Sequence, residues 1–213
     1  MKRTIIVGDI HGCYDELMAL HDKLNLHPED RVVCVGDLIV KGERNREVVE
    51  LFMRDERFSS VLGNHDRAIL RHWQGLEAAS KPAQEACLKE LDAGRHRYAA
   101  YLAALPLKID LGSHLVVHAG LRPGVSLDEQ SVEDLTELRT LGPDRTSREG
   151  VPWYEVYNGE KIVIFGHWPA DEPRRGPRSL GLDTGCVYGQ RLTAYVLETG
   201  EFTSVPARRA YSE

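Results

Sequence analysis

The chain of 213 residues has no long apolar run, few cysteines and no excess of basic residues. No apolar stretch approaches the ~20 residues that a membrane-spanning helix needs. The basic start Met1-Lys2-Arg3 is followed by only a short apolar stretch before Gly8. A secretion signal needs an apolar core of ~7–15 residues, so the sequence predicts neither secretion nor a membrane partner.

Cysteine is scarce, and the cysteines form no CxxC pair. Disulfide scaffolds of secreted proteins have many closely spaced cysteines. We therefore expect free thiols in a reducing, cytoplasmic setting. The four cysteines are Cys13, Cys34, Cys87 and Cys186.

Basic residues are outnumbered, because 27 Lys and Arg against 33 Asp and Glu give a net charge of −6. Generic nucleic-acid binding needs a basic face and is not expected here. The glycine-rich phosphate loops GxGxxG and GxxxxGK[ST] are absent as well. Their absence argues against a nucleotide-binding module without hydrolysis.

The chain does contain a repeated pattern, in which a short β-branched strand ends abruptly in a small polar cluster. Continuous Val and Ile runs suit strands that are buried on both faces. The predicted strands span 4–7, 31–35, 59–62, 113–117 and 161–165, and the clusters begin at Gly8, Gly36, Gly63, His118 and Gly166.

Helical patterns alternate with these strands. The predicted helices cover 14–26, 45–54, a segment N-capped by Asp66, 80–105, and a segment after the capping-box sequence 131–134. Residues 142–152 and 169–179 are expected loops, and strands at 192–197 and 202–205 form a hairpin. This order predicts one layered α/β domain over 1–213, with a helical insertion or lid at about 68–105.

Every strand-end cluster carries residue types that bind metal ions, and α/β folds place their chemistry in such loops. One Gly-Asp turn or one histidine would mean little, but five such clusters together indicate a metal centre. Carboxylates with imidazoles suit Mn, Fe, Co or Zn better than Ca. Since six ligands exceed one tetrahedral site, we expect two ions ~3.5–4 Å apart. The candidate ligands are Asp9, His11, Asp37, Asn64, His118 and His167.

The motif order GDIHG, GD, GNHD, HAG and GH resembles the metallophosphoesterases of the phosphoprotein phosphatase superfamily. The segments GDIHGCYDEL, GDLIVKG, HAGLRPG and LDTGCVYG are most similar to the diadenosine-tetraphosphatase and ApaH-like branch. The resemblance covers nearly the whole chain and thins over about 72–97 and 142–158. It implies the calcineurin-like α/β fold, a two-sheet β-sandwich flanked by helices in four layers, αββα.

The resemblance also implies a role for individual residues. Asp37 would bridge two divalent ions, with Mn²⁺ or Co²⁺ preferred and Fe, Zn or Mg open. His65 would act as the general acid beside the leaving group. The ligands of the first ion would be Asp9 and His11, and those of the second would be Asn64, His118 and His167.

One departure from the family pattern concerns the loop after Asp37. The family has GDxVDRG where this chain has GDLIVKG, so Val40 replaces Asp and Lys41 replaces Arg. Valine cannot orient the catalytic histidine, so either Asp66, another group or water orients His65, or the pKa of His65 stays nearer its unperturbed value. The departure weakens a phosphoprotein-phosphatase interpretation and favours a nucleotide-polyphosphate substrate.

Basic and aromatic residues near the motifs are candidates for substrate binding. Lys41 offers phosphate a point charge, and Arg122 in HAGLRPG is the strongest phosphate candidate. The other phosphate candidates are Arg44 and Arg67, followed by Arg174 and Arg175, and the candidates for stacking on adenine are Tyr188, Trp168 and Trp153.

The sequence thus predicts a monomeric metal-dependent hydrolase of dinucleoside polyphosphates. Its predicted reaction is the symmetrical cleavage of diadenosine tetraphosphate to two ADP. The same site chemistry leaves serine/threonine phosphoproteins, inorganic polyphosphate and capped RNA ends open as substrates. A non-catalytic metal-binding scaffold is the alternative of another class, and it should have lost some ligands, whereas all six positions and His65 are occupied.

Overall fold

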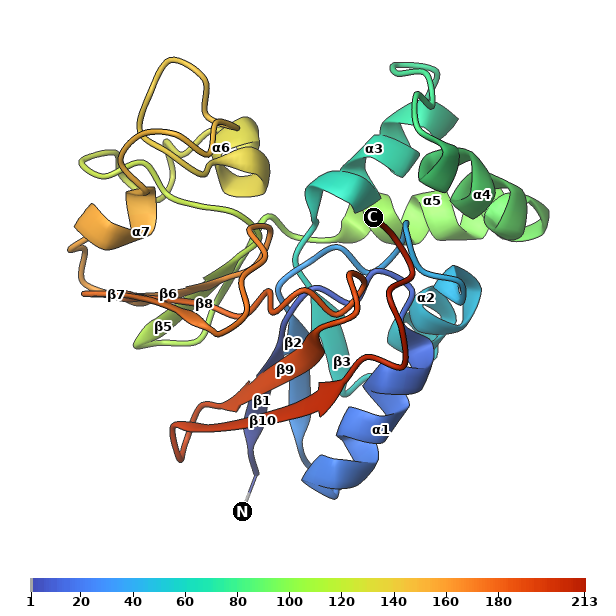
Figure 1. Cartoon of the computed structure of the whole chain (residues 1–213), viewed down its shortest axis with the longest axis horizontal. Helices are drawn as coiled ribbons and strands as arrows, with labels where there is room; N and C mark the ends of the chain where they lie inside the picture. Colours follow the sequence, from blue (N-terminus) through green and yellow to red (C-terminus); the bar gives the residue numbers. More distant parts are fainter. Residues whose placement is uncertain (1) are drawn as a thin grey trace.

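The computed structural model describes residues 2–213, which form two five-stranded sheets (Figure 1). The first sheet has the order β10-β9-β1-β2-β3, and the second has the order β4-β5-β6-β8-β7. In the first sheet β1, β2 and β3 are parallel, and in the second β5, β6 and β8 are parallel. The parallel strands therefore send their carboxyl ends to one edge of each sheet, where a site can form.

The predicted strands are confirmed, with ends that shift by one or two residues. The first sheet contains β1 Thr4–Val7, β2 Arg31–Cys34, β3 Phe58–Ser60, β9 Arg191–Val196 and β10 Glu201–Pro206. The second contains β4 Lys108–Asp110, β5 His114–Val117, β6 Ile162–Phe165, β7 Arg174–Gly176 and β8 Ser179–Gly181.

The β-branched runs are explained by burial on both faces of each sheet. In β1, Ile6 packs in the cluster between the sheets with Val116 and Ile164. Its neighbours Ile5 and Val7 point the other way, into the core beneath the helices. Because side chains alternate along a strand, only a continuously apolar sequence fills both layers.

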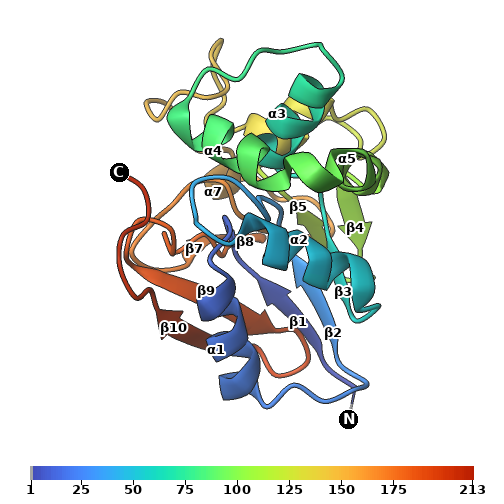
Figure 2. The same cartoon turned by 90° about the vertical axis from the view of Figure 1, so that its right-hand side faces the viewer.

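Helices cover the outer faces of the sheets, which completes the predicted four layers (Figures 1 and 2). Helices α1 Tyr14–Leu24 and α2 Asn45–Arg54 pack on the first sheet. Helix α7 Trp153–Val156 packs on the second sheet, and α6 Val132–Glu137 contributes Leu135 to the same core cluster. Among the described residues, no helix has the length and hydropathy to cross a bilayer.

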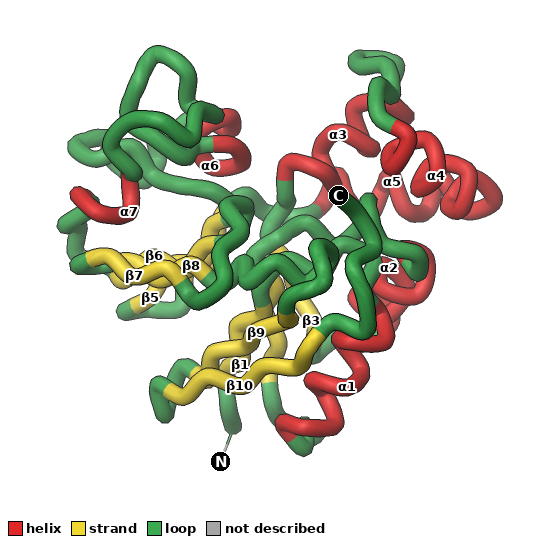
Figure 3. Tube along the Cα trace, in the orientation of Figure 1, coloured by secondary structure: helices red, strands yellow, loops and turns green. Residues whose placement is uncertain are grey.

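A lobe of three helices follows β3: α3 Asn64–Trp73, α4 Pro82–Leu91 and α5 Arg95–Ala104 (Figure 3). Their buried side chains, such as Leu91 and Leu102, belong to the core of the first sheet. The segment 80–105, expected to be all-helical, is helical over 82–104, and the 3₁₀ turn η1 Asp92–Gly94 divides it into α4 and α5. Glycine favours such an interruption of a helix. That the lobe moves as a lid stays a prediction.

Three other expectations need correction. Asp66 is the third residue of α3 rather than its N-cap, because the helix already begins at Asn64. The segment 169–179 contains β7 and the start of β8, which are too short and too rich in Arg and Gly to show a strand pattern. β4 was also missed, for the same reason of length. The capping position before α6 is confirmed, since the Ser131 hydroxyl accepts a hydrogen bond from Asp134 N at 3.0 Å.

Candidate metal centre

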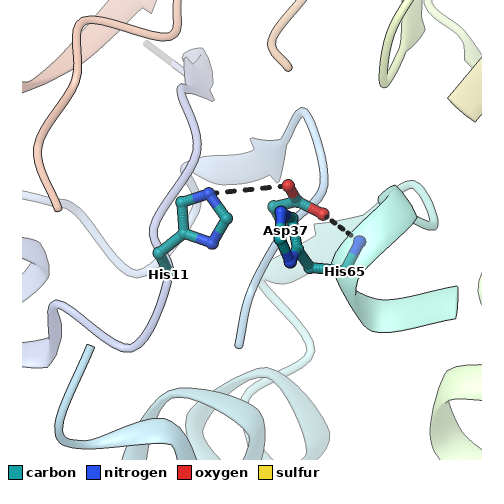
Figure 4. A group of neighbouring side chains, drawn as sticks. All are labelled: His11, Asp37 and His65. Atoms are coloured by element: carbon teal, nitrogen blue, oxygen red, sulfur yellow. Dashed lines mark hydrogen bonds and ion pairs between the residues drawn. The ribbon is translucent and has the colours of Figure 1, made fainter. Parts of the chain in front are cut away.

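The structure brings the six predicted ligands together at the carboxyl ends of the parallel strands. Asp37 lies at the centre, with Oδ2 3.5 Å from Nε2 of both His11 and His118. Its other oxygen accepts a hydrogen bond from the backbone N–H of His65 at 2.9 Å (Figure 4). A carboxylate between two imidazoles is placed as a bridging ligand would be.

The remaining ligands come from both sheets. Asp9 and Asn64 follow β1 and β3 of the first sheet, and His118 and His167 follow β5 and β6 of the second. Asn64 Oδ1 lies 2.9 Å from His118 Nε2 and 3.0 Å from His167 Nδ1. The backbone N–H of His167 donates to both oxygens of Asp9, at 3.1 and 3.2 Å. Ligand atoms of Asp9, Asp37 and His118 lie within 4.8 Å of one another. Loops from both sheets therefore build one site.

Each of the three imidazoles has one ring nitrogen within hydrogen-bond distance of a backbone carbonyl oxygen. That nitrogen carries the proton, because a carbonyl oxygen can only accept a hydrogen bond. The other nitrogen then presents a lone pair, as in the histidine ligands of metal proteins. The carbonyl contacts are His11 Nδ1 with Ile39 O at 3.3 Å, His118 Nδ1 with Val35 O at 2.8 Å, and His167 Nε2 with Glu137 O at 3.2 Å.

The lone pairs of these imidazoles point at the oxygens of Asp37 and Asn64. Burial lowers the pKa of His118 to about 4 and lowers the pKa of His11 and His167 well below the usual value, so the rings are neutral at pH 7. Nitrogen and oxygen lone pairs repel each other unless a cation lies between them. Among the described residues the chain supplies such a charge only at His11, where the Lys41 ammonium lies 3.1 Å from Nε2.

Burial also raises the pKa of the carboxyl groups, that of Asp37 to about 6 and that of Asp9 well above its usual value. The ionised form of each of these carboxyl groups is therefore destabilised unless a positive charge lies beside it. A set of carboxylate, amide and neutral imidazole donors fits a pair of divalent transition ions. The donor set does not select one ion among Mn, Co, Fe and Zn.

The ligands sit on a backbone that turns sharply after each strand. His11, Asp37 and His167 have φ values of 50°, 53° and 66°, in the left-handed region that non-glycine residues seldom adopt. Such strain costs on the order of 1–3 kcal/mol per residue and is concentrated at functional sites. The backbone N–H of His11 donates to Asp37 O at 2.7 Å, which holds the two turns together.

Glycines beside the ligands are required by close approach. A Cβ at Gly63 would lie 2.1 Å from Asp37 Oδ1, and one at Gly166 would lie 2.0 Å from Asp9 Oδ1. Either methyl group would displace a ligand carboxylate. The glycines of GNHD and GH therefore serve the site directly.

His65 lies beside the ligands, with its ring 5.1 Å from the ring of His11 in an edge-to-face arrangement. Its Nδ1 is buried and has no hydrogen-bond partner among the described residues. Asp66, one of the groups proposed to orient it, instead accepts hydrogen bonds from the backbone N–H groups of Leu38, Ile39 and Gly63 at 3.2–3.3 Å. Asp66 therefore anchors the loop after β2, and direct orientation of the His65 ring by Asp66 is wrong.

Lys41 is brought into the site. Its Nζ lies 3.1 Å from His11 Nε2 and 5.3 Å from the centre of the Tyr188 ring. Lys41 and Val40 both have positive φ, 74° and 75°. A β-branched residue in this region is a strong outlier. The turn that strains Val40 is also what directs Lys41 toward the ligands.

The arginines behave differently, because carboxylates already neutralise them. Arg122, the strongest phosphate candidate, pairs with Asp134 through two hydrogen bonds of 3.0 Å. It borders a separate cavity of about 460 Å³ with Leu127 and Lys161. Arg44 pairs with Asp15 and Glu47, and Arg67 with Glu133 and Glu137. Of the three arginines, only Arg67 borders the cavity at the candidate centre.

The more distant candidates do not reach the centre either. Arg174 stacks on Trp168, with the guanidinium 4.6 Å from the ring centre. Arg175 lies over the ring of Phe202. Trp153 is fully buried in the core of the second sheet, so it packs rather than binds a base.

Two residues of the site were missed by the sequence. Arg139 lines a cavity of about 330 Å³ together with Asn64, His65 and His167. The Arg139 Nε is buried without a hydrogen-bond partner, and Nη1 donates to Thr146 O at 3.0 Å. No motif surrounds Arg139, so no sequence pattern indicates it.

Asp183 is the second missed residue. It is buried, burial raises its pKa to about 6, and its charge in turn raises the pKa of Asp9. It follows β8 just as Asp9 follows β1, with a glycine nearby. The LDTG sequence therefore has the pattern that indicates Asp183. The strand before it, β8, has only three residues and shows no strand pattern of its own.

The comparisons with known proteins agree with this geometry. The family model described as calcineurin-like phosphoesterase matches residues 2–201. The chain is 32% identical over 233 residues to bis(5'-nucleosyl)-tetraphosphatase PrpE [asymmetrical] of Halalkalibacterium halodurans, which covers 96% of this chain and 94% of that protein. It is 28% identical over 253 residues to the symmetrical bis(5'-nucleosyl)-tetraphosphatase of Glaesserella parasuis, covering 89% and 93%.

A solved structure supports the same assignment. The crystal structure of a protein provisionally described as a diadenosine tetraphosphatase superposes with a TM-score of 0.84 at 34% identity, covering 97% of this chain and 94% of that one. The fold and the resemblance that the sequence predicted are confirmed. The chain is a hydrolase that belongs to the calcineurin-like phosphoesterase family.

Proposed function

We propose that this protein hydrolyses dinucleoside tetraphosphates at a two-ion centre. The observation that carries the proposal is the set of three buried, neutral imidazoles whose lone pairs point at the oxygens of Asp37 and Asn64. The names of the relatives support this choice of substrate, both for the asymmetrical enzyme and for the symmetrical one. The ligands would be Asp9, His11, Asp37, Asn64, His118 and His167.

When bound, two divalent ions supply hydroxide near neutral pH and charge neutralisation for phosphoryl transfer. The side chains of the protein would provide further positive charge for the phosphate groups of the substrate. Lys41, beside His11, adds a positive charge on the side of the first sheet. Arg139, which lines the cavity beside Asn64 and His65 and forms no ion pair within residues 2–213, would offer its guanidinium to a phosphate oxygen. Phosphate contacts of this kind stabilise the charge that develops in the transition state.

His65 is the residue that we propose to protonate the departing oxygen. Burial lowers the pKa of its imidazole, and the negative charge of a bound polyphosphate would raise it again. To act as the acid the ring must be the imidazolium, which is protonated at both nitrogens and becomes neutral imidazole when it gives one proton to the departing oxygen. Proton transfer of this kind accelerates a reaction by ~10²–10⁴-fold.

The position of cleavage is the finer part of the proposal. The sequence predicts symmetrical cleavage to two ADP. The relatives that carry the asymmetrical name reach 32% identity, and the symmetrical one reaches 28%. These names favour asymmetrical cleavage to AMP and ATP, which we propose over the symmetrical reaction.

One assay tests both parts. Metal-stripped protein would be reloaded with Mn²⁺, Co²⁺, Mg²⁺ or Zn²⁺ and offered diadenosine tetraphosphate, polyphosphate, a phosphopeptide and an aryl phosphate. We expect ion-dependent hydrolysis that is fastest for the tetraphosphate, with equal amounts of AMP and ATP on chromatography. ADP alone would restore the symmetrical prediction. Faster cleavage of the phosphopeptide would favour a protein phosphatase, and inactivity with every ion would favour a scaffold.

A further inference from the structure

A second cluster of metal-binding groups lies outside the candidate centre. The Sγ atoms of Cys13 and Cys186 and a carboxylate oxygen of Glu16 all lie within 4.8 Å of one another. Each of these residues is 2% exposed. Cys13 directly precedes α1, Glu16 lies in its first turn, and Cys186 lies in the loop between β8 and β9. The cluster therefore joins two regions that are distant in sequence.

Only one of the two carboxylate oxygens of Glu16 has hydrogen-bond partners among the described residues. Its Oε1 accepts hydrogen bonds from the Tyr211 hydroxyl at 2.7 Å and from the backbone N–H of Arg208 at 2.9 Å. Its Oε2 is buried and has no hydrogen-bond partner within residues 2–213. Buried carboxylate oxygens normally find a donor or a cation. The unpartnered oxygen therefore leaves one ligand position of Glu16 available beside the two thiols.

We propose that Cys13, Cys186 and Glu16 bind a Zn²⁺-like divalent ion that is distinct from the ions of the phosphoesterase centre. Thiolate ligands select Zn²⁺ over the harder ions that suit the carboxylate and imidazole site. Three protein ligands leave the fourth tetrahedral position to water. Each thiol that binds releases its proton to water, and the oxidation states do not change.

The geometry needs only small movements to accommodate such an ion. With Zn–S bonds of about 2.3 Å, a tetrahedral ion places its two sulfurs about 3.8 Å apart. The ligand atoms already lie within 4.8 Å of one another, so side-chain shifts of about 1 Å suffice. Cys13 and Glu16 border a cavity of about 310 Å³ that is also lined by Arg44, Arg208 and Tyr211, which provides a route for the ion.

The position of the cluster gives the ion a structural role. Cys13 lies two residues after the predicted ligand His11, and Cys186 lies three residues after Asp183. An ion bound here would tie the loop that follows β1 to the loop that follows β8. Both loops carry carboxylates of the candidate centre, so the second ion would stabilise the framework of the first site.

Cobalt(II) can test this proposal, because thiolate ligands produce a charge-transfer absorption in the near ultraviolet that carboxylate and imidazole ligands do not. Full-length protein, loaded with Mn²⁺ and kept reduced with a non-thiol reductant, would be titrated with Co²⁺. We expect the band to saturate at one Co²⁺ per chain and to disappear when Zn²⁺ is added. Absence of the band in the wild-type protein would overturn the proposal.

Variants locate the site. Cys13→Ser and Cys186→Ser should each lose the band, whereas Cys87→Ser, a change at another buried cysteine, should keep it. Asp37→Asn, which damages the phosphoesterase centre, should keep it as well. A band that survives both Cys13→Ser and Cys186→Ser would disprove the site.

A further variant keeps the test decisive if a cysteine substitution prevents folding. Glu16→Gln retains both thiols and the Oε1 that binds Tyr211 and Arg208. It should weaken Co²⁺ binding by about tenfold or more, at least the loss that follows removal of a supporting residue. Unchanged affinity would show that Glu16 is not a ligand and would overturn the three-ligand site.

Discussion

Two groups of buried carboxyl groups in this protein have pKa values that are shifted in opposite directions. Asp30 and Asp134 are buried against Arg3 and Arg122, whereas Asp9 and Asp37 form no ion pair with Arg or Lys in residues 2–213. Burial alone would raise the pKa of all four carboxyl groups. In Asp30 and Asp134 the arginines outweigh burial and lower the pKa, and at the centre burial wins and raises it.

The direction of the pKa shift therefore distinguishes two kinds of carboxylate. Asp30 and Asp134 are neutralised by an arginine of the chain, whereas Asp9 and Asp37 need a bound cation. The pairing of carboxylates with arginines also explains why most of the predicted phosphate-binding arginines are not free. Arg44, Arg67 and Arg122 already serve as the built-in cations of nearby carboxylates. Arg139, which lines the cavity at the centre and forms no ion pair within residues 2–213, is the better candidate for phosphate.

The strongest test of this comparison is Asp37→Asn, which removes a central carboxylate of the group without a built-in cation. We expect loss of bound metal together with a fall in kcat on the order of 10⁴-fold or more, as for one member of an interdependent catalytic unit. Elemental analysis and turnover would be measured on the same sample. Full activity with two ions bound would show that Asp37 does not bridge.

His65→Ala should separate proton transfer from metal binding. The variant should keep both ions, since His65 is not a predicted ligand, and its turnover should fall by ~10²–10⁴-fold on a substrate with a poor leaving group. An aryl phosphate, whose leaving group needs no proton, serves as the control and should lose much less. Equal losses on both substrates would reject the general-acid role.

A matched pair of arginine variants tests the comparison at the rim of the site. Arg139→Ala should lower kcat/KM by ~10–10²-fold, the value of a hydrogen bond between charged groups. Arg122→Ala should change kcat/KM by no more than about twofold, because its guanidinium is held by Asp134. If Arg122→Ala instead caused the larger loss, Arg122 would be the phosphate residue that the sequence indicated.

Lys41→Ala should have a smaller and more selective effect. Removing the ammonium group beside His11 should raise KM for diadenosine tetraphosphate by about tenfold, the value of one charged contact. KM for an aryl phosphate should rise less, because that ester has one phosphate group. Equal increases for both substrates would mean that Lys41 does not sense the length of the phosphate chain.

Asp30→Asn tests the other half of the comparison, far from the centre. The Asp30 carboxylate accepts hydrogen bonds from Arg3 and from the backbone N–H of His27. Because its folded pKa is lowered, its stabilising effect is present above the unfolded pKa of ~4 and is lost as pH falls below it. We expect a loss of about 1–3 kcal/mol in the free energy of unfolding at pH 7.

Urea unfolding of the wild type and of Asp30→Asn at pH 7 and at pH 3.5 or below, if both remain folded there, would check this expectation. The difference in the free energy of unfolding should shrink at the lower pH, because the Asp30 carboxyl gains a proton in the unfolded chain while it stays ionised in the folded protein. A difference that is the same at both pH values would show that the ionised carboxylate is not what stabilises this region.

The sequence determined the strands, the candidate ligands at their ends and the family. β-Branched runs followed by Gly, Asp and His are local patterns, and parallel strands place their carboxyl ends at one edge of a sheet. That is why Asp9, Asp37 and His167 could be named in advance. Helix breaks such as η1 and short strands such as β8 were missed because their local patterns are weak.

Only the tertiary structure decided which charged groups are free and which are paired. Arg67 meets Glu133 and Glu137, and Glu16 meets Cys186, across separations that no local pattern records. The free energy of a charge depends on burial and on its nearest opposite charge in space. Neither quantity can be read along the chain, so the availability of Arg139 and the thiol cluster emerged only from the fold.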